Sequence, residues 1–125
     1  MTNIEIIEII DNQVKFSSLL GNGSAIWKGE LPQIGHSYGI EFDIDNVFEW
    51  DVDITCAKHK TASINTVDSN VIFNAKIISY ENDGILTVSL GGDIIFLEIS
   101  ENPNVDGYVS FSVPVNNISI YPVEL

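Results

Sequence analysis

The chain has 125 residues, 45% of them hydrophobic, and its 18 acidic residues against five lysines and no arginine give a net charge of −13. This length and hydrophobic content fit a compact domain with a real core and exclude a disordered chain. The charge argues against binding to nucleic acid or to an anionic membrane surface, because both depend on lysine and arginine to neutralise phosphate. The electrostatic partner expected for such a chain is a basic protein.

The N-terminus and the cysteine content predict a cytoplasmic location. Residues 1–12, MTNIEIIEIIDN, have no basic segment before the isoleucine-rich run, and glutamates interrupt that run. The segment therefore reads as neither a secretory signal nor a membrane span. Cys56 is the only cysteine, which excludes an internal disulfide and fits a reducing compartment.

Strands are expected throughout the first half of the chain. Runs rich in isoleucine, valine and aromatic residues, bounded by glycine, asparagine, aspartate or proline, are typical of strands separated by tight turns. Asp11-Asn12 and Gly21-Asn22-Gly23 are the turns that we expect between the first three strands. The predicted strands are 4–10, 14–20, 25–31 and 38–45.

The second half carries stronger hairpin signals. Asn82-Asp83-Gly84 and Gly91-Gly92 each separate two strand-like runs, and Asp-Gly and Gly-Gly are favoured in tight hairpin turns. The strands expected here are 72–81, 85–90, 93–99, 108–113 and 118–121.

Strand number and spacing predict an all-β fold, a small OB-like or Greek-key barrel with additional N-terminal antiparallel strands. We expect a single compact domain over residues 1–125. A second arrangement has two sub-barrels, 1–58 and 70–125, because the region between them is polar and rich in threonine, serine and asparagine.

Residues 74–123 resemble a TOBE-type module, the small OB-like barrel appended to some transport ATPases and molybdate-responsive proteins. The resemblance lies in the runs AKIISYENDGILTVSL, GGDIIFLEIS, DGYVSFSV and NNISIYP. It implies a barrel and a role in binding a small ligand such as an oxyanion or a sugar. Lys76 is the only lysine in this segment, so the family's oxyanion binding does not carry over.

In EFDIDNVFEWDVDI, residues 41–54, carboxylates occupy every second position from 41 to 45 and again from 49 to 53, six in all. This alternation predicts two strands with an acidic face and an apolar face. A hairpin around residues 46–48 would set the acids opposite one another as three like-charged pairs, which cost on the order of 1–3 kcal/mol. Burial of Phe42, Ile44, Trp50, Val52 and Ile54 on the other face would outweigh that cost. The six acids are Glu41, Asp43, Asp45, Glu49, Asp51 and Asp53.

Three interpretations of this acidic face are open from the sequence. It is a solvated strand face, a surface that binds a basic protein, or a site for a divalent cation. The segment lacks the glycine turn and the distal glutamate of a helix-loop-helix calcium site. We therefore assign the six acids to partner binding and none of them to a metal.

Other candidate sites are weaker. Cys56 and His59 have the spacing C-x-x-H, but no second pair of zinc ligands occurs. Gly21-Asn22-Gly23-Ser24 lacks the lysine of a phosphate loop. Trp27 and Tyr38 are either core residues or line a barrel mouth.

The function expected from the sequence is that of a non-catalytic, acidic protein-binding module, such as an immunity or antitoxin-type inhibitor of a basic partner. No nucleophile, base and orienting group can be assembled, so we expect neither an enzyme nor a cofactor. The alternative is a TOBE-like accessory domain for an anion, a sugar or a divalent cation. Unpaired strand edges are also compatible with a homodimer.

Overall fold

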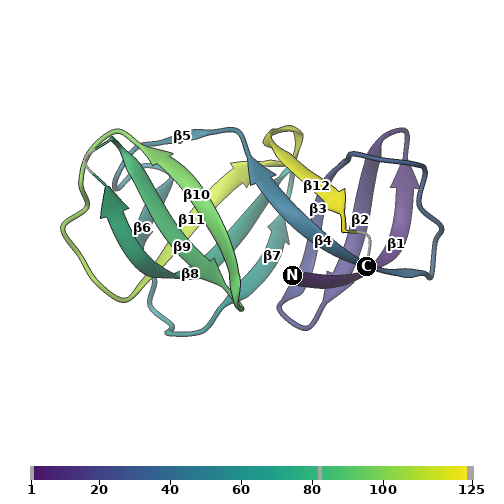
Figure 1. Cartoon of the computed structure of the whole chain (residues 1–125), viewed down its shortest axis with the longest axis horizontal. Coiled ribbons are helices and arrows are strands. Elements are labelled where there is room, and N and C mark those ends of the chain that lie inside the picture. Colours follow the sequence, from purple (N-terminus) through teal and green to yellow (C-terminus); the bar gives the residue numbers. More distant parts are fainter. Residues whose placement is uncertain (1, 82, 124–125) are drawn as a thin grey trace.

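The computed structural model describes residues 2–81 and 83–123, and its regular secondary structure consists almost entirely of β-strands (Figure 1). The all-β prediction is therefore confirmed. The strands are β1 (Thr2–Ile10), β2 (Gln13–Ser18), β3 (Gly21–Trp27), β4 (Ser37–Ile44), β5 (Val47–Phe48), β6 (Ile54–Cys56), β7 (Ser63–Val67), β8 (Asn70–Glu81), β9 (Ile85–Leu90), β10 (Asp93–Ile99), β11 (Tyr108–Pro114) and β12 (Ile118–Pro122). A short 3-10 helix, Val115–Asn117, precedes β12.

Five strands form a closed barrel. β4, β1, β2 and β3 lie side by side in that order, each antiparallel to the next, which is the strand order of a Greek key. β12 closes the barrel because it pairs antiparallel with β4 and parallel with β3. The barrel prediction is confirmed, although the closed barrel is built mainly from the N-terminal strands and the additional strands lie between β4 and β12 in sequence.

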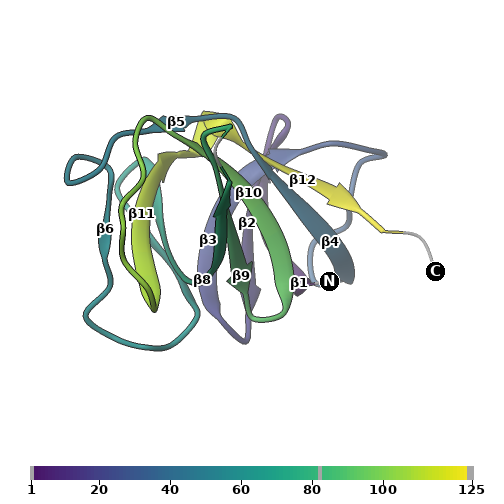
Figure 2. The same cartoon turned by 60° about the vertical axis from the view of Figure 1, so that its left-hand side comes forward.

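Residues 45–117 form a second sheet that is inserted between the last two strands of the barrel. β8, β9 and β10 form an antiparallel meander, β11 pairs with β8, and the short β5 and β6 join β10 and β11 (Figure 2). β7 lies between the two units, antiparallel to β8 and in parallel contact with the start of β3 (Figure 1). Strands that precede and follow the polar region 59–70 in sequence are therefore paired with each other, because β12 pairs with β3 and β4 of the barrel.

A row of phenylalanine rings joins the cores of the two units. Phe42 on β4 contacts Phe16 of the barrel and Phe73 of the second sheet, with ring centroids 6.2 and 5.7 Å away. Phe73 stacks on Phe111 at 5.2 Å, and Phe111 meets Phe48 at 5.5 Å. Each fully buried ring contributes roughly 1.5–3 kcal/mol, so this row stabilises the two units as one core.

The predicted hairpin over residues 41–54 is wrong. β4 pairs with β1 and β12 instead, and the chain after Ile44 crosses to β10, where β5 pairs in parallel with Glu98 and Ile99. The crossing is held at the barrel by the Asp45 N–H, which donates to the carbonyl of Asn117 at 2.9 Å. Residues 49–53 form a turn, and Val52, expected inside, is 69% exposed.

The predicted turn at residues 21–23 is also wrong. β3 begins at Gly21, and the turn consists of Leu19 and Leu20. The Ser18 hydroxyl supports this turn, because its oxygen accepts from the Leu20 N–H at 3.1 Å and donates to the Gly21 carbonyl at 2.8 Å. Of the other predicted turns, Gly91-Gly92 is confirmed, and Asn82 lies outside the described residues.

Within the described ranges there is no helix with the length and apolar character needed to cross a membrane.

Candidate protein-binding surface

The structure separates the six predicted carboxylates into two groups. Glu41 and Asp43 are exposed on β4, opposite Tyr121 and Ser119 of β12. Asp45 follows directly after β4 and is also exposed. This first group keeps the outward orientation that the alternation predicted.

Glu49, Asp51 and Asp53 belong to the turn between β5 and β6. The Asp53 carboxylate accepts from the Glu49 N–H at 2.7 Å, and the Asp53 N–H donates to the Glu49 carbonyl at 3.2 Å. Asp51 has a φ of 65°, a left-handed conformation that aspartate tolerates better than most residues. Asp53 therefore shapes the turn, while Glu49 and Asp51 are exposed.

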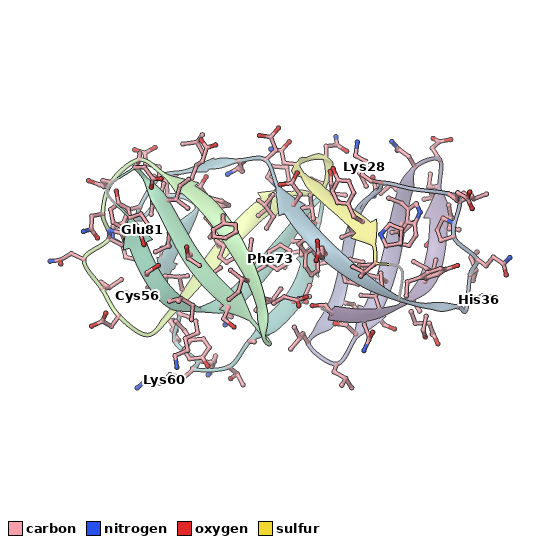
Figure 3. All side chains as sticks on the ribbon, in the orientation of Figure 1. Lys28, His36, Cys56, Lys60, Phe73 and Glu81 are labelled. Atoms are coloured by element: carbon pink, nitrogen blue, oxygen red, sulfur yellow. The ribbon has the colours of Figure 1, made fainter. Side chains whose placement is uncertain are left out.

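A groove between β4 and β10 brings the β4 acids together with a residue that sequence reasoning missed. It has a volume of about 400 Å³ and is lined by residues 41–44 and 93–96. Asp93 supplies a third carboxylate, and its side chain accepts a hydrogen bond from the Thr2 hydroxyl. Phe73 lies between the two strands when the groove is viewed from outside (Figure 3).

Apolar side chains share this groove with the acids. Ile94 is 51% exposed and Phe96 is 65% exposed, whereas Ile95 between them and Leu97 after them are buried. None of the eight lining residues is basic. We call this surface, made of Glu41, Asp43, Asp93, Ile94 and Phe96, the acidic groove.

A signal for the apolar part of the groove was present in the sequence. If alternate residues Ile95, Leu97 and Ile99 of β10 face the core, then Ile94 and Phe96 must point outward. Two large apolar residues on an outer strand face indicate a contact surface. Nothing in the sequence indicated that β10 lies beside β4, because the two strands are about 50 residues apart in the chain.

The weaker candidates do not form sites. Trp27 is buried and its ring packs edge-on against Tyr38 at 5.1 Å. The Trp27 indole donates to the Glu30 carbonyl at 2.6 Å, so these aromatics hold the loop after β3. Cys56 is exposed, and no three histidine, cysteine or acidic side chains among the described residues are placed to hold a metal ion.

Comparisons with protein families, curated proteins and solved structures find no significant match to this chain.

Proposed function

We propose that this protein is a non-catalytic binding module that covers a basic surface of a partner protein, as an immunity or antitoxin-type inhibitor does. The observation that carries the proposal is the acidic groove, which combines three carboxylates with two exposed apolar side chains and has no basic residue in its lining. A cytoplasmic location, consistent with the lone Cys56, is part of the same proposal.

The composition of the groove suits a protein partner better than a small anion. Protein interfaces place apolar side chains at the centre and polar groups around them, as Ile94 and Phe96 are placed beside the acids. The net charge of −13 would accelerate the encounter with a basic protein and repel acidic competitors.

The predicted acids are expected to contribute unequally. Glu41 and Asp43 line the groove and would contact the partner directly. Asp45, Glu49 and Asp51 are exposed outside its lining and would act at longer range. Asp53 is engaged in its own turn, and we expect its substitution to affect stability more than binding.

Fewer observations support the alternative of a TOBE-like ligand domain. The segment that resembles that module does not form a barrel of its own, because its last strand, β12, pairs with β3 and β4. A groove lined by three carboxylates would also repel an oxyanion.

The proposal is tested by measuring binding to the basic proteins encoded next to this gene, at about 50 and about 300 mM salt. We expect affinity to fall as salt rises, because the attraction between exposed charges is screened. Calorimetry on the double variant Glu41→Gln/Asp43→Asn should show affinity about tenfold lower at the lower salt concentration.

A control of equal charge is the double variant Glu101→Gln/Asp106→Asn, since both acids are exposed on the β10–β11 loop outside the groove lining. It should lose much less affinity than the groove variant. Equal losses for the two variants, or affinity that does not depend on salt, would contradict the proposal.

A further inference from the structure

Strand β10 has one edge that is largely unpaired. It pairs with β9 along its whole length, but on its other side β5 reaches only Glu98 and Ile99. No described strand pairs with residues 94–97 on that side. This open edge borders the acidic groove.

The register of the β9–β10 hairpin shows which main-chain groups point to the open edge. Leu90 and Asp93 flank the two-residue turn, whose glycines have φ values of 60° and 103°. The flanking residues of such a turn bond to each other, and bonded pairs then alternate along the ladder. Ile95 and Leu97 therefore bond to β9, whereas the N–H and C=O groups of Ile94 and Phe96 point away from it.

Two hydrogen bonds near the end of β10 agree with this assignment. The Ile99 N–H donates to the Gly84 carbonyl on the β9 side at 2.9 Å. The Ser100 N–H donates to the Phe48 carbonyl on the opposite side at 3.0 Å. Even-numbered residues of this strand thus present their main chain to the open edge.

The facing strand β4 pairs with β12 on one side, and no described strand pairs with its residues 41–44 on the other side, over the same groove. Among the described residues, the last residue of β4 that pairs with β1 is Ile40, opposite Thr2. Odd-numbered residues of β4 bond to β12, as the bond from the Val123 N–H to the Gly39 carbonyl and that from the Asp45 N–H show. The main-chain groups of Phe42 and Ile44 therefore face β10 across the groove.

We propose that the acidic groove binds an extended basic segment of the partner, which adds as a strand to the open edge of β10. This inference rests on the proposed function and names the mode of recognition. Main-chain groups of Ile94 and Phe96 would bond to the segment, as in other cases of strand addition. Its apolar side chains would cover those of Ile94 and Phe96.

The charges around the open edge of β10 favour a basic segment as the binding partner. Glu41, Asp43 and exposed Glu98 surround the open edge, so lysine or arginine at alternate positions of the segment would meet carboxylates. A second copy of this chain fits poorly, because two β10 edges would bring these acids together on molecules that each carry −13.

The spacing of the two edges favours bonding to one of them. The nearest Cα atoms of β4 and β10 lie within 8 Å. A strand bonded on both sides needs two spacings of about 4.8 Å, or roughly 9.6 Å. At these closest points a strand placed about 4.8 Å from β10 would lie only about 3 Å from β4. The added segment would therefore bond to β10 alone, and β4 would have to move away from it there.

The first test uses a capped peptide of alternating lysine and valine and amide hydrogen exchange of the whole protein by NMR. We expect the Ile94 and Phe96 amides to exchange at least about tenfold more slowly with the peptide bound, and the Ile95 and Leu97 amides, already bonded to β9, to change little. The same peptide with glutamate in place of lysine should not bind. The strand-addition proposal is overturned if neither the Ile94 nor the Phe96 amide is protected, or if protection appears only at Phe42 and Ile44.

The second test compares Phe96→Pro with Phe96→Ala. Both variants lose the ring, but only proline also removes the outward N–H, and proline is tolerated at such edge positions. We expect the proline variant to bind the peptide about tenfold more weakly than the alanine variant, with similar melting temperatures. Ile95→Pro is the control for an inward N–H and should lower the melting temperature markedly.

The two proposals fail in different ways. If a basic protein binds with the expected salt dependence but the proline and alanine variants bind alike, strand addition is excluded and the proposed function stands. If the peptide protects Ile94 and Phe96 but neutralising Glu41 and Asp43 changes nothing, strand addition stands and the choice of a basic partner is wrong.

Discussion

Gly21 is the barrel residue that pairs with the second sheet. It lies opposite Ile64 of β7, and the adjacent Leu20 carbonyl accepts from the Ile64 N–H at 2.8 Å. A Cβ atom at Gly21 would lie 1.9 Å from the Ile64 carbonyl oxygen, and the glycine has a φ of 128°. The residue that the sequence assigned to a turn is needed because only glycine allows this approach.

Gly21→Ala is therefore expected to destabilise the protein by about 3 kcal/mol or more, because backbone strain adds to a clash with main-chain atoms. Urea unfolding of the variant measures the loss. Gly35→Ala is a matched control, since Gly35 has a φ of 83° and no atom within 4 Å of an added Cβ. It should cost only about 1 kcal/mol, from strain alone. Equal losses in the two variants would show that the contact with β7 does not matter.

The turn at residues 49–53 is an element whose acids have a local structural role. Its chain reversal depends on the Asp53 carboxylate, which accepts the Glu49 N–H. We expect Asp53→Ala to lower the free energy of unfolding by about 1 kcal/mol, the usual value of one hydrogen bond. Asp53→Asn retains an acceptor oxygen and should lose less, although it removes the same charge. If chemical denaturation gave the same loss for both, charge and not the hydrogen bond would be responsible.

Local signals predicted single elements well. Residues 85–90 and 93–99 were expected as strands, and β9 and β10 have those bounds because Gly91-Gly92 fixes both the turn and the register. On β4, period-two alternation predicted correctly that Glu41 and Asp43 face outward and that Ile44 is buried. Alternation predicts which face of a strand is buried, however, and not which strands pair with it.

The neighbours of β4 are set by contacts that are distant in sequence. Its partners β1 and β12 begin near opposite ends of the chain, and a hairpin with the next acidic run looked equally compatible with the pattern. Asp93 was missed as a site residue for the same reason, and so was the position of Ile94 and Phe96 beside the acids of β4. The acidic groove exists only where a strand of the barrel comes close to a strand of the inserted sheet.

At the scale of the whole molecule, closure of the barrel depends on a strand that follows the entire inserted sheet. Ile120 of β12 is fully buried and pairs with Trp27 of β3 and with Phe42 of β4. Phe42 in turn contacts Phe73 of the second sheet. Loss of packing at β12 should therefore reach both units, and the acidic groove between β4 and β10 should be lost with them.

Ile120→Ala tests this coupling, because each unit contains its own tryptophan. Trp27 reports on the barrel and the half-buried Trp50 on the inserted sheet, so Trp50→Phe and Trp27→Phe backgrounds isolate the two fluorescence signals. We expect Ile120→Ala to lower the free energy of unfolding by about 2–5 kcal/mol and to move both denaturation midpoints by the same amount, as in a single cooperative transition. A midpoint that moves for Trp27 and not for Trp50 would show that the barrel opens while the inserted sheet stays folded. The groove would then be a contact between two independently folding units.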